Sequence, residues 1–240
     1  MTSGYNPSKQ VWLNSNIEYL FGDDIIEYDI RDAGFNIIKQ YKLLPDEKIR
    51  ELTLMGKGEA RHIAVGKLQR DDKDFSNKLL DKFTEVRKIF ISTNNLSDDD
   101  IISVKKDAIY TIGRCNRTKF GGIEFAEKNH YTSYIRFPDI NNLEIYYTSN
   151  NMDIKGMGDH AINRHRLYMY EFIMSAIGMI ENNNQRVKRI ISKFIDDYKS
   201  LSLDEEFYVE FNNMSREINP IFNYKNIIIP LVKIILKEME

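Results

Sequence analysis

The sequence predicts an α+β fold with an antiparallel sheet, packed helices and a helical C-terminal third. Strand-like and helix-like runs occupy separate stretches of the 240-residue chain instead of alternating, so a doubly wound parallel sheet is not expected. From His160 onward the apolar spacing is helical almost to the end. We expect an N-terminal arm over residues 1–22, an α+β core over 23–158 and a helical region over 159–240.

The core is expected to begin with a strand. Ile25, Ile26, Tyr28 and Ile30 are β-prone residues set among acidic ones, a pattern that favours a strand. Helical segments then follow over 33–41, 45–55 and 57–69. Pro45 suits a first helical turn, where its missing N–H costs nothing.

The clearest helix lies over residues 72–96. Apolar side chains recur there at steps of three and four residues, which gives one apolar stripe. The stripe consists of Phe75, Leu79, Leu80, Phe83, Val86 and Phe90, and Asn94 and Asn95 end the helix.

Strands are expected after this helix, over 101–104, 108–113, 121–137 and 143–149, with a turn at "PDINN" between the last two. Three helices are expected in the C-terminal third, over 164–181, 184–201 and 226–239.

Composition limits the classes of function. Lys and Arg nearly balance Asp and Glu, giving a net charge of −2, so nucleic acid would have to bind a local basic patch. The single cysteine, Cys115, excludes an internal disulfide and a cysteine-based zinc site. No apolar run reaches the length of a membrane span, and the N-terminus does not resemble a secretory signal. We therefore expect a cytoplasmic protein, in the host cytoplasm if a phage encodes it; the Asn, Ile and Lys bias points to AT-rich coding DNA.

Two carboxylates are the candidate catalytic and metal-binding residues. Asp29 ends the first strand-like run, and Asp107 lies between "SVKK" and "AIYTIG". Considered alone, each residue has an alternative role that involves no metal. Asp29 could be a helix N-cap or a turn residue, and Asp107 could be a solvent-facing strand residue beside two lysines. Together, carboxylates on adjacent strands can hold two Mg²⁺ ions about 3.5–4 Å apart, an arrangement suited to phosphoryl transfer.

The order strand, carboxylate, helices, hairpin and second carboxylate resembles a reduced palm of the family B DNA polymerases. "YDIRDAGFNII" is similar to the first palm motif, and "VKKDAIYTI" to the aspartate-containing hairpin motif. The resemblance identifies Asp29 and Asp107 with the two metal-binding aspartates. It covers residues 23–160 as short patches. Lys105 stands in place of the first hairpin aspartate, and Gly34 in place of the sugar-gating tyrosine.

This resemblance implies a phage-type nucleotidyltransferase acting on DNA with Mg²⁺. Phosphate contacts would come from Lys57, Arg61, Lys106 and Lys155. The fingers segment is nearly absent, so the chain would be a reduced polymerase or one subunit of a split polymerase that joins a second chain. The alternative is a non-catalytic interaction or structural subunit of a larger phage assembly, in which both aspartates are ordinary surface groups.

Overall fold

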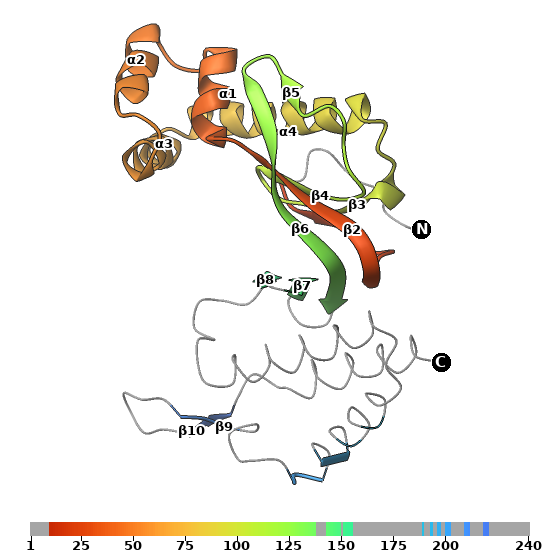
Figure 1. Ribbon diagram of the computed structural model, residues 1–240. Coiled ribbons are helices and arrows are strands. Elements are labelled where there is room, and N and C mark those ends of the chain that lie inside the picture. Colours follow the sequence, from red (N-terminus) through yellow and green to blue (C-terminus); the bar gives the residue numbers. More distant parts are fainter. Residues whose placement is uncertain are drawn as a thin grey trace. The chain divides into compact units, whose positions relative to one another are not determined.

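The computed structural model describes residues 10–137, 143–149 and 151–155, and short pieces of the C-terminal third at 189, 193, 196–197, 200–202, 209–211 and 218–220. The described part is α+β, with helices packed on an antiparallel sheet (Figure 1), so the predicted fold class is confirmed. The predicted helices over 164–181 and 226–239, most of the one over 184–201, the "PDINN" turn and residues 1–9 of the predicted arm lie outside the described residues.

The chain divides into two compact units. One comprises residues 1–17 and 24–130, and the other comprises residues 18–23 and 131–240. The long strands β2 (Tyr19–Ile30) and β6 (Ile123–Phe137) belong partly to each unit.

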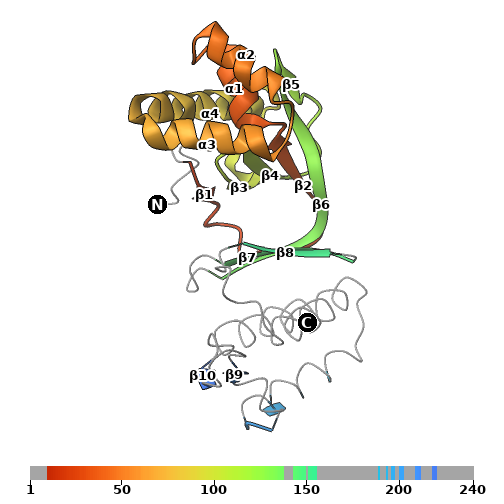
Figure 2. The same ribbon diagram turned by 90° about the vertical axis from the view of Figure 1, so that its left-hand side faces the viewer.

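The helices of the first unit follow one another in the chain as the sequence predicts. They are α1 (Ala33–Tyr41), α2 (Asp46–Leu54), α3 (Glu59–Asp71) and α4 (Lys73–Thr93). Helix α4 begins where the Asp72 side chain accepts a hydrogen bond from the Phe75 N–H, an N-cap contact. Figure 2 shows α3 and α4 side by side, and both also contact α1.

The sheet of the first unit has the order β1-β3-β4-β2-β6. The further strands are β1 (Trp12–Leu13), β3 (Ile101–Val104) and β4 (Ala108–Ile112), and β5 (Lys119–Phe120) pairs with β6. The strand pair β2–β4 is antiparallel and sets Asp29 opposite Ala108. This register decides which side chains meet at the end of β2.

The core of the first unit lies between α4 and the sheet. The predicted stripe of α4 is buried except for Leu80, which is partly buried. Phe90 packs against Tyr28 and Phe125 at ring-centroid distances of 5.2 and 4.4 Å. From the sheet, Ile26 and Ile30 join this cluster. Burial of these large apolar side chains is the main source of stability for the unit.

The second unit contains the later part of β6, paired with β7 (Leu143–Thr148), which pairs with β8 (Asn151–Lys155). Tyr131 and Tyr134 are buried there and both pack against the buried Tyr146 ring, so these aromatic side chains form part of the sheet core. The short strands β9 (Val209–Phe211) and β10 (Ile218–Pro220) pair with each other.

Candidate functional site

The β3–β4 hairpin turn brings Asp107 next to the end of β2. The Lys105 N–H donates to the Ala108 carbonyl at 2.8 Å, so Lys106 and Asp107 form the turn. The Ile30 N–H donates to the Asp107 carbonyl at 3.0 Å. Because Asp29 lies opposite Ala108, the two carboxylates come from adjacent strands at one end of the sheet.

A fully buried arginine of α4 holds this turn. The guanidinium of Arg87 donates to the Lys106 carbonyl at 2.6 Å and to the Gln10 side-chain oxygen at 3.2 Å. It also donates to the Thr84 hydroxyl at 3.2 Å. The position of Asp107 therefore depends on the packing of α4 against the hairpin.

The end of β2, the hairpin turn, α1 and α3 together line an open cleft of about 350 Å³. Three of the sequence-predicted site residues, Asp29, Lys106 and Asp107, line it. Its other polar lining residues are Asp32, His62 and Gln69. The cleft thus gathers carboxylates, a lysine, a histidine and a glutamine around one open volume.

Burial raises the pKa of Asp29 above its ordinary value, and the neighbouring charge of Asp107 acts in the same direction. The opposing influence is Lys128 of β6, whose Nζ lies 2.8 Å from Asp29 Oδ2. This hydrogen bond in turn raises the pKa of the Lys128 amine. The ionised form of Asp29 is therefore costly unless a cation lies beside it.

The Lys106 side chain extends from the hairpin turn to α3 and α4, which contribute to the lining of the cleft. Its Nζ is 3.3 Å from the Gln69 side-chain oxygen and 5.2 Å from the centre of the Phe83 ring. An ammonium held by one neutral acceptor and one aromatic face keeps donors to offer to an anion. Of the basic residues predicted to bind phosphate, Lys106 lines the same cleft as Asp29 and Asp107.

Arg61, another residue predicted to bind phosphate, is buried and forms an ion pair with Asp32. Its guanidinium also stacks over the Phe35 ring, 4.1 Å from the ring centre. The Asp32 side chain is 7% exposed, and its other oxygen lies 3.4 Å from His62 Nε2. Arg61 thus joins α3 to the start of α1, behind the lining of the cleft.

The two remaining predicted phosphate-binding lysines lie elsewhere. Lys57 is exposed in the connection between α2 and α3 and does not line the cleft. Lys155 ends β8 in the second unit, where it forms an ion pair with Asp153 at 2.5 Å.

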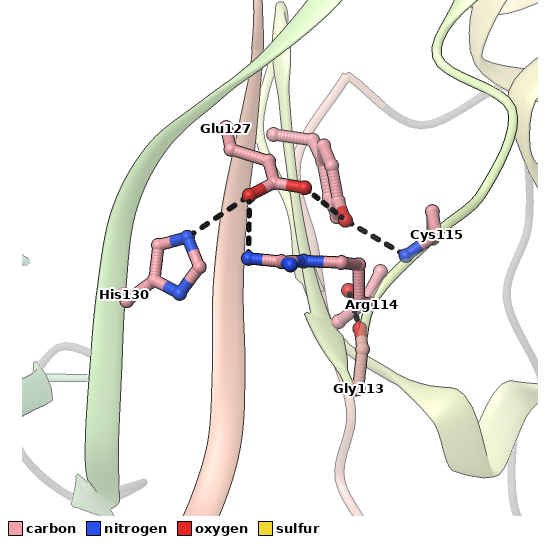
Figure 3. A network of polar contacts seen from close by, with 7 residues as sticks. Gly113, Arg114, Cys115, Glu127 and His130 are labelled. Carbon is pink, nitrogen blue, oxygen red and sulfur yellow. Dashed lines mark hydrogen bonds and ion pairs between the residues drawn. The ribbon is translucent and has the colours of Figure 1, made fainter.

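Strand β6 carries Lys128, and a polar network fixes the strand beside it. Figure 3 shows Glu127 between Arg114 and His130, each 3.1 Å from its Oε2. Tyr28 of β2 completes the network, because its hydroxyl accepts the Cys115 N–H at 2.7 Å and lies 3.5 Å from Glu127 Oε1. Tyr28 and Glu127 directly precede Asp29 and Lys128 in their strands, so this network joins β2 to β6 on the opposite face of the sheet from the Asp29–Lys128 pair.

The sequence did not single out Asp32, Lys128 or Glu27. Lys128 Nζ also lies 3.5 Å from Glu27 Oε1, which makes it a neighbour of two carboxylates. Alternate residues of a strand point to one face, so the spacing of Glu27 and Asp29 was a usable signal. The pairing of β6 with β2 that brings Lys128 next to them could not be predicted from the sequence.

A larger cleft of about 500 Å³ lies between the end of α4 and the loop after β4. Its lining is polar, with arginine and asparagine side chains, but includes no acidic residue. It therefore offers no carboxylate to a cation, and we assign the candidate site to the cleft at Asp29 and Asp107. Among the residues that the structure describes, no group of three or more histidine, cysteine or acidic side chains is arranged to hold a metal.

The chain matches the model of the bacteriophage PBS1 gene 130 protein family over residues 1–238, and it belongs to that family. The match supports a phage origin. A comparison with curated proteins finds no match. None of the described helices is long and apolar enough to cross a membrane.

Proposed function

We propose that this phage protein is a nucleic-acid protein with a palm-like core, and that the cleft at Asp29 and Asp107 binds Mg²⁺ for nucleotidyl transfer. The observation that carries the proposal is the convergence of these two carboxylates, from adjacent strands, on the lining of one open cleft. The resemblance to a family B polymerase palm assigns the same two residues.

Two protein carboxylates are enough for such a site when the substrate supplies further oxygens. Mg²⁺ is commonly held by one or two carboxylates together with water and substrate phosphates. Lys106, on the same cleft, is the residue we assign to phosphate. In this proposal the protein mainly supplies position and charge, which is what phosphoryl transfer requires.

The proposed substrate is DNA, and the proposed place of action is the host cytoplasm. The segment between α1 and α4 contains only the two helices α2 and α3. A segment of this size is too short to form a complete polymerase fingers domain. We therefore propose that a second chain of a split polymerase supplies what this one lacks.

The alternative function is a non-catalytic subunit of a larger phage assembly. The Asp29–Lys128 ion pair favours it, because a paired carboxylate needs no metal. The two functions differ in one measurable property, the binding of a divalent cation that depends on Asp29 and Asp107.

The test is isothermal titration of the full chain with Mn²⁺, alone and in the presence of a primer–template duplex. The variant is Asp29→Asn with Asp107→Asn, and the matched control is Asp81→Asn, an exposed carboxylate of α4. We expect binding to wild type and to the control, and none to the double variant. Primer extension would then be assayed with the same three proteins.

Absence of Mn²⁺ binding under both conditions would refute the metal site and favour the non-catalytic subunit. Binding that survives in the double variant would place the cation elsewhere and would equally refute the assignment of Asp29 and Asp107.

A further inference from the structure

The open cleft of about 500 Å³ between the end of α4 and the loop after β4 differs in chemistry from the candidate site. We call it the arginine cleft, after Arg114 and Arg117 in its lining. The other polar side chains that line it are asparagines, a serine and a threonine, and the described lining residues include no acidic or aromatic side chain. Arginine, asparagine, serine and threonine are residues that commonly contact phosphate oxygens of nucleic acids.

The loop that carries the two arginines is held in place by hydrogen bonds to its backbone. The Cys115 N–H donates to the Tyr28 hydroxyl at 2.7 Å. At the end of α4, Asn94 binds both backbone groups of Arg117: its Oδ1 accepts the N–H at 2.9 Å, and its Nδ2 donates to the carbonyl at 2.7 Å. The loop is therefore positioned before any ligand arrives, which lowers the entropic cost of binding.

Both guanidinium groups are available to a ligand. The Arg114 side chain is 61% exposed, and its Nη2 lies 3.1 Å from Glu127 Oε2 (Figure 3). This contact uses one nitrogen of a group that has five N–H donors. Arg117 is exposed, and its guanidinium forms no ion pair or hydrogen bond with the described residues. Guanidinium groups bind phosphate oxygens through paired hydrogen bonds.

The negative groups near the arginine cleft already have partners of their own. Carbonyls in the last turns of α4 accept the backbone N–H groups of residues 94–96, which weakens the negative end of the helix. In the acidic turn that follows, the Asp100 carboxylate accepts the N–H and the hydroxyl of Ser97 at 2.7 and 2.6 Å. Glu127 is paired with Arg114 and His130. An anion in the cleft therefore lies beside guanidinium and neutral groups.

We propose that the arginine cleft binds the phosphate groups of a nucleic-acid strand through Arg114 and Arg117, without reading the bases. The described lining offers no aromatic ring for base stacking. An acidic protein segment fits less well, because protein interfaces depend on apolar or aromatic anchors in pockets, and the described nonpolar lining consists of Leu96 and Cys115. With a net charge of −2, the chain needs a local basic patch to hold nucleic acid.

This inference goes beyond the proposed function and does not depend on metal binding, because the arginine cleft and the cleft at Asp29 share no lining residue. The two clefts adjoin opposite ends of β4: Asp107 precedes the strand and Arg114 follows it. A strand bound in the arginine cleft would therefore be held by contacts separate from those at the proposed metal site.

The experiment measures the fluorescence anisotropy of a short labelled single-stranded DNA of mixed sequence, titrated with the full chain without divalent metal at several salt concentrations. The variant is Arg114→Gln with Arg117→Gln. The control, Arg31→Gln with Arg50→Gln, removes the same charge. Arg31 is exposed and paired with a glutamate, as Arg114 is, Arg50 is exposed on α2, and neither lines either cleft.

We expect the Arg114→Gln, Arg117→Gln variant to bind roughly tenfold more weakly at low salt, and the control to bind as wild type does. The slope of log affinity against log salt concentration should become shallower by about 1.4, from about 0.7 for each phosphate contact with a single strand. The loss should be the same for oligonucleotides of different sequence, since phosphate contacts carry no base information.

A measurement on the wild-type chain covers the case in which the variant does not fold. Arginines are modified briefly with phenylglyoxal, with and without the oligonucleotide, and quantified by mass spectrometry. We expect the oligonucleotide to slow modification of Arg114 and Arg117 severalfold and to leave Arg50 unchanged.

Four results would overturn the proposal: no binding of the oligonucleotide by wild type, equal affinities of the variant and the control, no protection of Arg114 and Arg117, or displacement of the oligonucleotide by an equal concentration of inorganic phosphate. Tighter binding of an acidic peptide of equal charge, lost in the same variant, would assign the cleft to a protein segment instead. If Lys106→Met weakens DNA binding and the arginine variant does not, the arginine cleft is wrong and the proposed function stands. If the arginine variant loses DNA affinity but wild type binds no Mn²⁺, the proposed function is wrong and the arginine cleft stands.

Discussion

Replacement of Arg87 by Met tests whether α4 holds the hairpin that carries Asp107. The fully buried guanidinium donates to the Lys106 carbonyl at 2.6 Å, and to Gln10 and Thr84 at 3.2 Å. Charge-assisted hydrogen bonds contribute about 1.5–3 kcal/mol each, so three give about 5–9 kcal/mol gross. The desolvation of a buried guanidinium offsets several kcal/mol of this. We expect a net loss of about 2–4 kcal/mol.

Urea unfolding followed by circular dichroism measures this loss. With a slope of about 2 kcal/mol per molar urea, the middle of the usual range, the expected loss lowers the midpoint by about 1–2 M. Arg31→Met is the control, because Arg31 is exposed and pairs with Glu124 at 3.2 Å, a contact worth under about 1 kcal/mol. The reasoning is refuted if both variants unfold within about 0.5 kcal/mol of each other. If the hairpin loosens as expected, Mn²⁺ affinity should fall in Arg87→Met as well.

Three further predictions concern single residues. Burial raises the pKa of Tyr28 from 10.0 to about 12, so the folded state favours the neutral phenol. The free energy of unfolding should therefore decline by about 2 kcal/mol as the pH rises from 10 to 12. Urea unfolding across that range should show a smaller decline in Tyr28→Phe. In Gly34→Ala the new methyl would lie 2.9 Å from Val65 Cγ1, so thermal unfolding should reveal a loss of about 1–3 kcal/mol, partly recovered by adding Val65→Ala. Because burial raises the pKa of Asp29 above 3.8, lowering the pH toward that raised value should protonate Asp29 and weaken Mn²⁺ binding. Titrations with Mn²⁺ at several pH values should show this loss of affinity in wild type, and the part due to protonation of Asp29 should be absent in Asp29→Asn.

Local patterns were sufficient for most elements of the first unit. The apolar stripe from Phe75 to Phe90 predicted α4, and β-branched runs predicted β3, β4 and β6, all of which the structure confirms. Strands β1 and β5 were missed because two-residue strands have no periodicity to detect. They exist only because a neighbouring strand offers hydrogen-bonding groups at its edge.

The sequence by itself determined where the chain turns and which faces of its elements are apolar, because these follow from residue type and from spacing along the chain. It also singled out Asp29, Lys106 and Asp107, whose place at strand ends is local information. Only the tertiary structure decided that Arg61 pairs with the buried Asp32 and that Lys128 reaches Asp29 from β6. Such pairs depend on strand register and helix packing, and a shift of one residue along β6 would turn Lys128 to the opposite face of the sheet.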